Sequence, residues 1–391
     1  MRRVVVTGLA PVSIHGIGKK AFFDSLMQKT MILSEVPPEY EVSYKFKSRC
    51  FVPAPAVDLE NSTLMEEMSK LAVVSAKLAV EDAKLQACEH CGVMMGVGIS
   101  GLKTGFESYE AHISAKGRFN RMCIPMLMPN AAAAWIAITL GAQGLCHTVN
   151  AACSSGAVAV GEGFLHIKNG TADCILAGGC EALDDGIGAI MRGFDMLTTL
   201  TLSQDGKPNP FSENRSGFLF NMGASCTLVL EELEHAKRRG ADIYAEIVDY
   251  RANCDAYNIV QMQTDGHKIR ELFEAVKDIN VDYINAHGTG TMLNDKIESS
   301  VFLDVFGANQ PLVNSTKGII GHTIGASGAI EAATTAYSIK NGMVHGNVTN
   351  NVLPNLNLPM DTVAWDIENA ISVSYGFGGH NTLLLMRKYH G

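Results

Sequence analysis

The sequence predicts an α/β protein with a mostly parallel sheet, and two observations support this class. Short runs of apolar and β-branched residues alternate along the whole chain with stretches of helical periodicity, an order typical of strands joined through helices. Several predicted strands are apolar at nearly every position, as in RVVVTG and CILAGG. Such strands are usually covered on both faces, so we expect layers of helices on either side of the sheet.

The predicted elements alternate from the first residues to the last. Strands are expected at 3–7, 93–97, 147–150, 174–177, 227–230, 244–248, 282–285, 371–374 and 382–386. Helical periodicity falls at 65–85, 155–168, 269–277 and 326–340. The segment 131–142 follows Asn130, a residue type that caps helices, so we expect a buried helix there. A charged helix, LVLEELEHAKRRGA, stops at Gly240, and we place a boundary there between two halves, 1–240 and 241–391.

The composition excludes several classes of function. Hydrophobic residues make up 47% of the 391 positions and charged residues 18%, so we expect a large core and some surface hidden against a partner copy. The net charge of −9 offers nucleic acid no basic surface. No run of about 18 apolar residues occurs, so no membrane span is expected. We interpret MRRVVVTG as a first core strand, because Thr7 and Gly8 interrupt it too early for a signal peptide.

Ten cysteines are scattered singly, apart from Cys88 and Cys91. Their CxxC spacing could supply half of a zinc site, but no second pair lies at zinc-finger distance. A turn before a strand is therefore the preferred interpretation, and no metal is expected. The spacings suggest no disulfide framework, and a reduced, cytoplasmic compartment fits them best.

The stretch NAACSSG places Cys153 among residues that are almost all small. Apolar residues then recur with helical spacing, so this cysteine is predicted to begin a helix directly after a strand. Unpaired N–H groups and the helix dipole favour negative charge there, so we expect the pKa of the thiol to fall. Small neighbours also leave room beside the sulfur. A buried structural cysteine remains the alternative at this point.

Three further motifs could supply partners for this sulfur. In VDYINAHGTGT, a strand delivers His287 to a glycine-rich loop, where it could face a cleft. In STKGIIGHTIGASG, Lys317 and His322 stand five residues apart before a helix. The glycines of VSYGFGGHN can expose backbone N–H groups, as an oxyanion hole requires, whereas we interpret His380 as structural. Cys/His chemistry fits acyl transferases and hydrolases alike.

These motifs occur in the order found in β-ketoacyl-[acyl-carrier-protein] synthases, and the chain resembles that family over nearly its whole length, most of all the elongating type. The resemblance implies a thiolase-like fold of five layers, αβαβα, made of two similar βα halves and forming a dimer. It also implies decarboxylative condensation of malonyl-carrier protein with an enzyme-bound acyl chain. No bound cofactor is implied, because the substrates are carried on the phosphopantetheine arm of acyl carrier protein.

The resemblance also implies roles for particular residues. The acylated cysteine matches Cys153, the two catalytic histidines match His287 and His322, and the family lysine that tunes the site matches Lys317. Backbone N–H groups of Cys153 and Phe377 would form the oxyanion hole, with the Phe377 ring as a gate. Thr289 and Thr291 match family positions that bind the pantetheine arm, and Ile99 matches a position that lines the acyl pocket. Asp295, Glu298 and Glu331 match family acids that brace the loops near the active site.

The chain departs from the family in three places, one of which is the loss, after CDAYNI, of about ten residues that relatives use before the next helix. The family pattern GF-x-x-G-E-G-A reads GFLFNMGA here, so Asn221 and Met222 replace a glycine and an acid. The segment LMEEMSKLA carries Glu66 and Glu67 where relatives often present basic residues to the carrier. We therefore expect carrier docking on the basic residues of AKGRFNR, which are Lys116, Arg118 and Arg121. These departures point toward a dedicated carrier and a specialised pathway, such as polyene or polyketide assembly.

Alternative functions remain at this stage. The enzyme could act as a homodimer, or as the catalytic subunit of a type II polyketide ketosynthase paired with a chain-length factor. A purely non-catalytic partner subunit would usually lack the cysteine that is present here. A Cys/His thioester hydrolase is a further alternative, and the buried context of the cysteine speaks against it.

Overall fold

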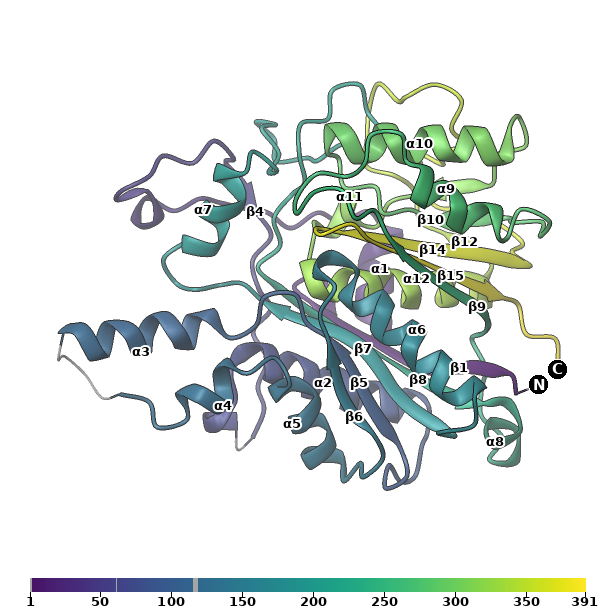
Figure 1. Ribbon diagram of the computed structural model, residues 1–391, viewed down its shortest axis with the longest axis horizontal. Coiled ribbons are helices and arrows are strands. Elements are labelled where there is room, and N and C mark those ends of the chain that lie inside the picture. Colours follow the sequence, from purple (N-terminus) through teal and green to yellow (C-terminus); the bar gives the residue numbers. More distant parts are fainter. Residues whose placement is uncertain (1, 61, 115–118) are drawn as a thin grey trace.

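The computed structural model describes residues 2–60, 62–114 and 119–391, and Figure 1 shows how they are arranged. Within these residues the largest sheet has eleven strands, ordered β11-β10-β14-β15-β9-β1-β8-β7-β5-β6 with β2 paired to β1. In the first half of the chain, its strands are β1 (Val4–Ser13), β2 (Gly16–Ile17), β5 (Gly92–Gly96), β6 (Cys146–Val149), β7 (Cys174–Ala182) and β8 (Gly223–Glu232). In the second half, they are β9 (Ala245–Cys254), β10 (Tyr283–Asn285), β11 (Leu312–Asn314), β14 (Asn369–Gly376) and β15 (His380–Arg387).

Helices and small strand pairs complete the described part of the chain. The helices are α1 (Lys19–Met27), α2 (Glu67–Asp82), α3 (Leu102–Ser114), α4 (Cys123–Leu127), α5 (Ala131–Leu140), α6 (Ser155–Lys168), α7 (Ala189–Met196), α8 (Leu233–Arg238), α9 (His267–Glu274), α10 (Met292–Phe306), α11 (Lys317–Ile320) and α12 (Ser327–Asn341). Short 3-10 turns are η1 (Pro38–Glu41), η2 (Ser62–Leu64), η3 (Ala152–Ser154) and η4 (Ile324–Ala326). Two further pairs are β3 (Ser34–Glu35) with β4 (Cys50–Phe51), and β12 (Met343–Val344) with β13 (Val363–Ala364).

The sheet is parallel only toward its edges, so the prediction of a mostly parallel sheet is wrong. β5 pairs in parallel with β6 and β7, and β10 pairs in parallel with β11 and β14. Every pairing from β7 through β8, β1, β9 and β15 to β14 is antiparallel. Continuous apolar sequence reports that both faces of a strand are covered, and it carries no information about strand direction.

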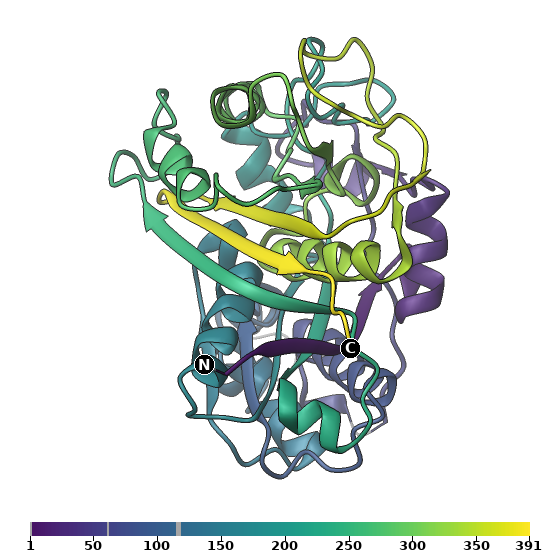
Figure 2. The ribbon, with the colours of Figure 1, turned by 90° about the vertical axis from the view of Figure 1, so that its right-hand side faces the viewer.

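The two halves of the sheet join along a short seam. Val4 to Val6 of β1 pair with Ile247 to Ala245 of β9. On either side of this seam the sheet halves diverge, and α6 and α12 fill the space between them, packed against each other (Figure 2). The seam therefore makes one hydrogen-bonded sheet out of two packed layers.

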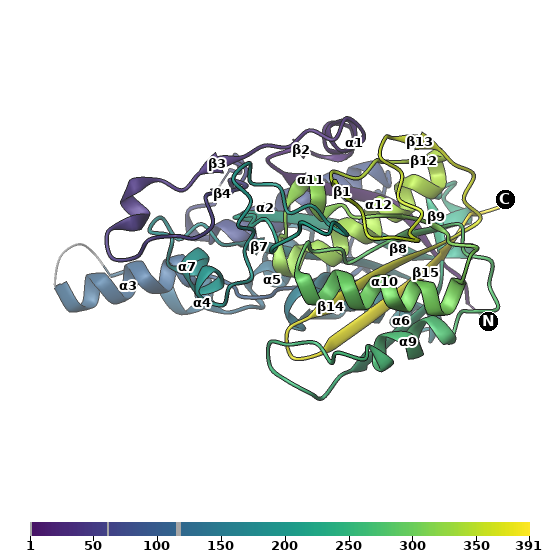
Figure 3. The ribbon, with the colours of Figure 1, turned by 90° about the horizontal axis from the view of Figure 1, so that it is seen from above.

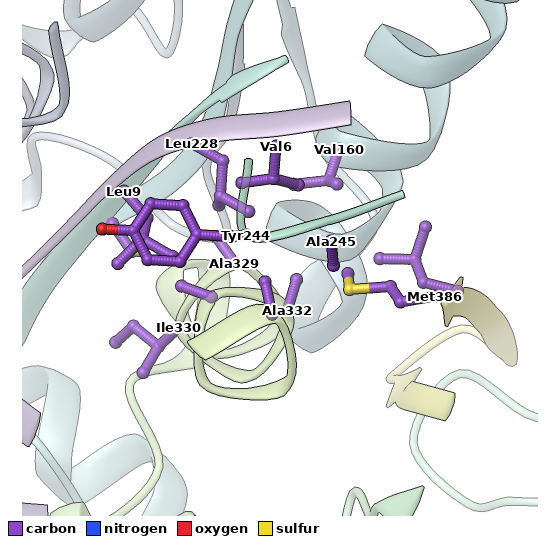
Figure 4. Packing of buried hydrophobic residues seen from close by; sticks show 14 of the residues in the cluster. Val6, Leu9, Val160, Leu228, Tyr244, Ala245, Ala329, Ile330, Ala332 and Met386 are labelled. Carbon is purple, nitrogen blue, oxygen red and sulfur yellow. The ribbon is translucent and has the colours of Figure 1, made fainter. Parts of the chain in front are cut away.

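Alternate residues of each strand face different layers, which explains the apolar runs. In β15, Leu384 and Met386 pack into the central cluster with α6 and α12, while Leu383 and Leu385 pack into the outer cluster with α9 and α10. The first half of the chain repeats this arrangement, with α2 and α5 as its outer helices. Figure 4 shows the central cluster, where Val160 and Ile330 come from the two central helices. The order helix, sheet, helix, sheet, helix is the five-layered αβαβα arrangement that the resemblance implied.

The nine predicted strands and the four helices predicted from periodicity are all present, with ends shifted by a few residues. The charged helix predicted over LVLEELEHAKRRGA is only partly correct, because LVLEE ends β8 and the helix is limited to α8. The helix expected at 131–142 is α5, but the Asn130 side chain makes no capping hydrogen bond, so that detail was wrong. α3 projects from the body at the end opposite the two termini (Figure 3). No helix among the described residues is long and apolar enough to cross a membrane.

Candidate active site

Cys153 lies at a tight turn between β6 and α6. Ala152 adopts φ 51°, in the left-handed region, and the Ser155 hydroxyl accepts the Ala151 N–H at 2.9 Å. The turn is packed against the glycine-rich bend after β14, where a β-carbon at Gly376 would collide with the Ala151 carbonyl oxygen. Within NAACSSG itself, a β-carbon at Gly156 would collide with the Ala329 backbone nitrogen, so this glycine is needed for close backbone packing.

The pKa of the Cys153 thiol is raised to about 12, so the sequence-based expectation of a lowered pKa is wrong. Burial is the main cause, because only 6% of the residue is exposed and a thiolate there loses its hydration. The Lys317 charge and the backbone N–H groups of Phe377 and Cys153 act in the opposite direction. The backbone N–H groups at the helix start thus lower the pKa of Cys153 by less than burial raises it, and the resting sulfur is a thiol.

His287 follows β10 and is held at its ring and its backbone. Lys317 Nζ lies 3.2 Å from His287 Nδ1 and donates to the His287 carbonyl at 2.8 Å. Burial, followed by the Lys317 charge, places the pKa of this imidazole well below its usual value. Because an ammonium faces Nδ1, the ring is neutral with its proton on Nε2.

His322 reaches the same state through different partners. Its Nδ1 lies 2.9 Å from the Ser327 hydroxyl and accepts the Ile324 N–H at 3.3 Å. Burial, with a contribution from Lys317, lowers the pKa of His322 well below 6.5. The ring centroids of His287 and His322 are 5.6 Å apart at an interplanar angle of 88°. The site therefore contains two neutral imidazoles, each with an N–H on Nε2.

Three buried acids lie behind the histidines. Glu298 accepts the N–H groups of His287 and Gly288, both at 2.8 Å, and burial raises its pKa to about 8. Asp295 accepts the N–H of Phe211 at 2.7 Å. Glu331 forms a buried ion pair with Lys317, and burial raises its pKa to about 7. Glu298 and Asp295 thus accept backbone N–H groups of loops at the site, and Glu331 contacts the lysine.

A pocket of about 400 Å³ connects Cys153 to the surface. Of the residues singled out from the sequence, those that line it are Cys153, His287, His322, Thr289, Thr291 and Phe377. Thr289 and Thr291 have their hydroxyl oxygens 2.9 Å apart. Ile99 is not among the lining residues, but packs in the apolar cluster that contains Cys153 and Phe377. Further lining residues that the sequence did not single out include Phe194, Leu197, Phe218, Val260 and Tyr375.

Glu181 is a buried residue at the site that sequence reasoning missed. Its carboxylate accepts N–H groups from Gly98, Ile99 and Ser100 and from Gly325, at 2.9 to 3.2 Å. It thereby ties the loop after β5 to the turn before α12. The only signal was an acid placed within an apolar strand, in CILAGGCEA.

The predicted docking residues stand apart from this geometry. Arg121 is exposed just before α4, and Lys116 and Arg118 lie outside the described residues. Glu66 is 4% exposed, caps α2 by accepting the Met68 N–H, and has its pKa raised to about 7 by burial. Only Glu67, which pairs with Lys70 at 2.6 Å, is presented to solvent.

A cysteine at a helix start, two neutral imidazoles and a narrow pocket within a five-layered αβαβα body define a thiolase-fold condensing enzyme. Residues 1–236 match the family described as Beta-ketoacyl synthase, N-terminal domain, and residues 244–351 match its C-terminal domain. The chain belongs to the β-ketoacyl synthase family and is an acyltransferase of that family.

Individual relatives agree with this membership. The chain is 34% identical to 3-oxoacyl-[acyl-carrier-protein] synthase 2 of Staphylococcus aureus, over 99% of both proteins. It is 32% identical to the chloroplastic synthase II of Arabidopsis thaliana, covering 99% of this chain and 76% of that protein. Among solved structures, a type II polyketide ketosynthase in complex with its acyl-carrier protein matches with a TM-score of 0.90 at 28% identity, over 99% and 100% of the two chains. A ketosynthase/chain length factor for ishigamide matches with a TM-score of 0.89 at 26% identity, over 100% of both.

Proposed function

We propose that this protein is a β-ketoacyl-acyl-carrier-protein synthase that elongates an acyl chain held on Cys153. In the first step, the Cys153 sulfur attacks the thioester of an acyl-carrier protein. A carbon–sulfur bond forms to Cys153, the bond to the carrier's arm breaks, and the thiol proton passes to the departing sulfur. Backbone N–H groups of Cys153 and Phe377, both directed at the cysteine sulfur, support an oxyanion hole for this step.

In the second step, malonyl-carrier protein enters the same pocket. Loss of CO₂ leaves an electron pair on the remaining thioester as an enolate. The enolate carbon attacks the Cys153 thioester and releases the cysteine sulfur as a thiolate, which takes up a proton from solvent and returns to the resting thiol. The enolate oxygen gains charge only as CO₂ leaves, so donors already in place stabilise the transition state more than the substrate. We assign those donors to Nε2–H of His287 and of His322. Lys317 keeps His287 Nδ1 occupied, so that the proton stays on Nε2.

The remaining residues of the pocket take supporting roles. Thr289 and Thr291 line the pocket, where they would hydrogen-bond the pantetheine arm. Ile99 would contact the growing acyl chain, and Phe377 would move as its gate. Asp295, Glu298 and Glu331 hold the loops and Lys317. No cofactor is assigned, because the carrier's arm brings both substrates, and we place the enzyme in the cytoplasm.

The observation that carries this proposal is one thiol and two neutral imidazole N–H donors around one narrow pocket. The test follows acylation and decarboxylation separately, with acyl- and malonyl-loaded carrier. We expect Cys153→Ala to lose the acyl-enzyme seen by intact mass and all condensation. His287→Ala and His322→Ala should still be acylated and should lose decarboxylation. Cys254→Ala, which removes an exposed cysteine, is the matched control and should behave as the parent. Full condensation by Cys153→Ala would refute the proposal.

A heterodimeric form of the same function is supported by the similarity to a ketosynthase/chain length factor. In that form this chain is the catalytic subunit, and a related subunit completes the acyl tunnel. The chain purified alone would then be inactive and would gain activity with that subunit, whereas an active homodimer would exclude the requirement. Thioester hydrolysis without malonate would instead indicate the hydrolase alternative.

A further inference from the structure

The mouth of the thiol pocket is formed by three separate segments of the chain. Leu197 follows α7, Val260 lies in the loop between β9 and α9, and Thr291 directly precedes α10. These lining residues are half-buried or exposed, whereas Cys153 and the two histidines are buried at the inner end. Anything that enters the pocket on an arm must therefore stop with its body against these three segments.

Large apolar side chains point to solvent at this mouth. Met196 is 60% exposed, Leu197 47%, Ile259 78% and Met292 57%. Each is either a lining residue or the chain neighbour of one, so all four surround the same opening, and we call them the collar. Exposed apolar groups gathered at one place, rather than scattered singly, mark surfaces that meet a partner.

The collar carries no charge of its own. The nearest cationic side chains on its helices are Arg192 and Lys296, each four residues, about one helical turn, from Met196 and Met292. Arg192 is already engaged, with its guanidinium 4.8 Å from the centroid of the Tyr44 ring. Contact at the collar itself would therefore gain free energy from apolar burial, and ion pairs could form only behind it.

We propose that the collar is the docking surface for the body of the acyl-carrier protein, and that this docking is mainly apolar. The inference rests on the proposed function, because the carrier is the partner whose arm must use this pocket. It assigns docking to a neutral surface, in place of the basic residues Lys116, Arg118 and Arg121 expected from the sequence. The carrier meets the collar with apolar side chains of its own, and binding depends weakly on salt.

The test compares two acyl donors on the collar variants Ile259→Asp and Met292→Asp, which change no lining residue. With acyl-carrier protein as donor, we expect KM for Cys153 acylation to rise about tenfold or more, because a charge is placed in an apolar contact. With an acyl thioester of free pantetheine as donor, acylation should be unchanged, because this donor has no carrier body. Met360→Asp is the matched control, since Met360 is 42% exposed on the loop before β13 and should leave both donors unaffected.

The same experiment separates the possible failures. If the pantetheine thioester fails to acylate Cys153 in the parent protein, the result contradicts the proposed function, and the docking proposal that rests on it is rejected as well. The proposal that the carrier docks on the collar is overturned if KM for the carrier is unchanged in both Asp variants. It is also overturned if the two substitutions change only the self-association of this chain. It is also overturned if raising salt from about 0.05 M to about 0.5 M weakens the carrier about tenfold and Arg121→Ala does the same. Retained carrier affinity over that salt range supports apolar docking.

Discussion

At the scale of single residues, Cys153 shows two effects acting on the same sulfur. A helix start and a nearby ammonium lower a thiol pKa, whereas loss of hydration raises it. Here burial is the larger effect and the pKa is about 12. Acylation therefore does not require Cys153 to be a thiolate in the resting enzyme. The thiol instead loses its proton as the thioester binds between the N–H groups of Cys153 and Phe377.

This assignment predicts the pH dependence of alkylation at Cys153. With exposed Cys146 and Cys254 replaced by serine, the iodoacetamide rate should rise about tenfold per pH unit from about pH 7 to about pH 9.5, because the thiolate fraction does so below the pKa. Lys317→Met should react more slowly at each pH, since Lys317 lowers the pKa of Cys153. A rate that levels off near neutral pH would contradict the raised pKa.

We expect a stabilising substitution at Tyr375, which lies beside His287. Its ring centroid lies 5.3 Å from that of His287, and its buried hydroxyl has no hydrogen-bond partner among the described residues. Tyr375→Phe removes an unsatisfied polar group, so we expect the free energy of unfolding to stay equal or to rise by about 1 kcal/mol. Urea denaturation gives the measurement.

Tyr283 provides the matched control for this substitution. It is equally buried, but its hydroxyl donates to Asn314 Oδ1 at 2.8 Å and accepts from Asn285 Nδ2 at 3.0 Å. Tyr283→Phe should therefore destabilise the protein. If both variants lose the same free energy, the Tyr375 hydroxyl is satisfied in solution and the prediction fails.

At the scale of elements, two turns with the same construction bring Cys153 and His322 to one pocket. Before α6, Ala152 has φ 51° and the Ser155 hydroxyl accepts the Ala151 N–H. Before α12, Ile324 has φ 49° and the Ser327 hydroxyl accepts the Thr323 N–H. We take this correspondence as support for two similar halves divided near Gly240. In the second half Ser327 also contacts His322, so the same turn now orients an imidazole.

Asn221, one of the departures from the family pattern, bridges two of these segments. Its Nδ2 donates to the Ile320 carbonyl at 2.7 Å, its Oδ1 accepts the Gly223 N–H at 2.9 Å, and its own N–H donates to the His322 carbonyl at 3.2 Å. Asn221→Ala removes the two side-chain hydrogen bonds and leaves the Ile320 carbonyl and the Gly223 N–H without them, so we expect a loss of about 2 kcal/mol in unfolding free energy.

Kinetics distinguish positioning of His322 from a general loss of stability. Below the unfolding transition, Asn221→Ala should be acylated at Cys153 as the parent is, while malonyl decarboxylation falls, because only that step uses His322. Asn169→Ala, at the exposed end of α6, is the control and should change neither. Equal losses in both steps would exclude a positioning role.

How much could be predicted from sequence differs between these elements. Strands and helices followed from periodicity, and the motifs led to Cys153, His287 and His322, which line one pocket, and to Lys317, which contacts His287 behind it. The antiparallel centre of the sheet could not be predicted, since strand direction leaves no trace in an apolar run. The anchoring of Ile99 by Glu181 and the mouth at Ile259 depend on contacts between residues distant in sequence, which no local pattern encodes.

At the scale of the whole molecule, buried titratable groups act in opposite directions on stability. Burial raises the pKa of Glu66 and Glu331 to about 7, which weakens the fold as pH rises from about 4.5 to about 7. Burial lowers the pKa of His15 and His345 to about 4, which weakens the fold as pH falls from about 6.5 to about 4. The measured free energy of unfolding contains all of these contributions. The effect of one histidine is therefore obtained by comparing the parent with a variant that lacks it.

His15 is the most direct case, and it gives the last prediction. It lies between β1 and β2, is 5% exposed, and neither ring nitrogen has a hydrogen-bond partner among the described residues. The unfolded chain binds a proton at this histidine below about pH 6.5 and the folded protein does not, so unfolding is favoured as pH falls. Between about pH 7.5 and about pH 5, the parent should lose about 2 kcal/mol more unfolding free energy than His15→Phe. His390→Phe, at an exposed position, should follow the parent, and a His15→Phe curve parallel to the parent's would show that this imidazole is protonated inside the fold.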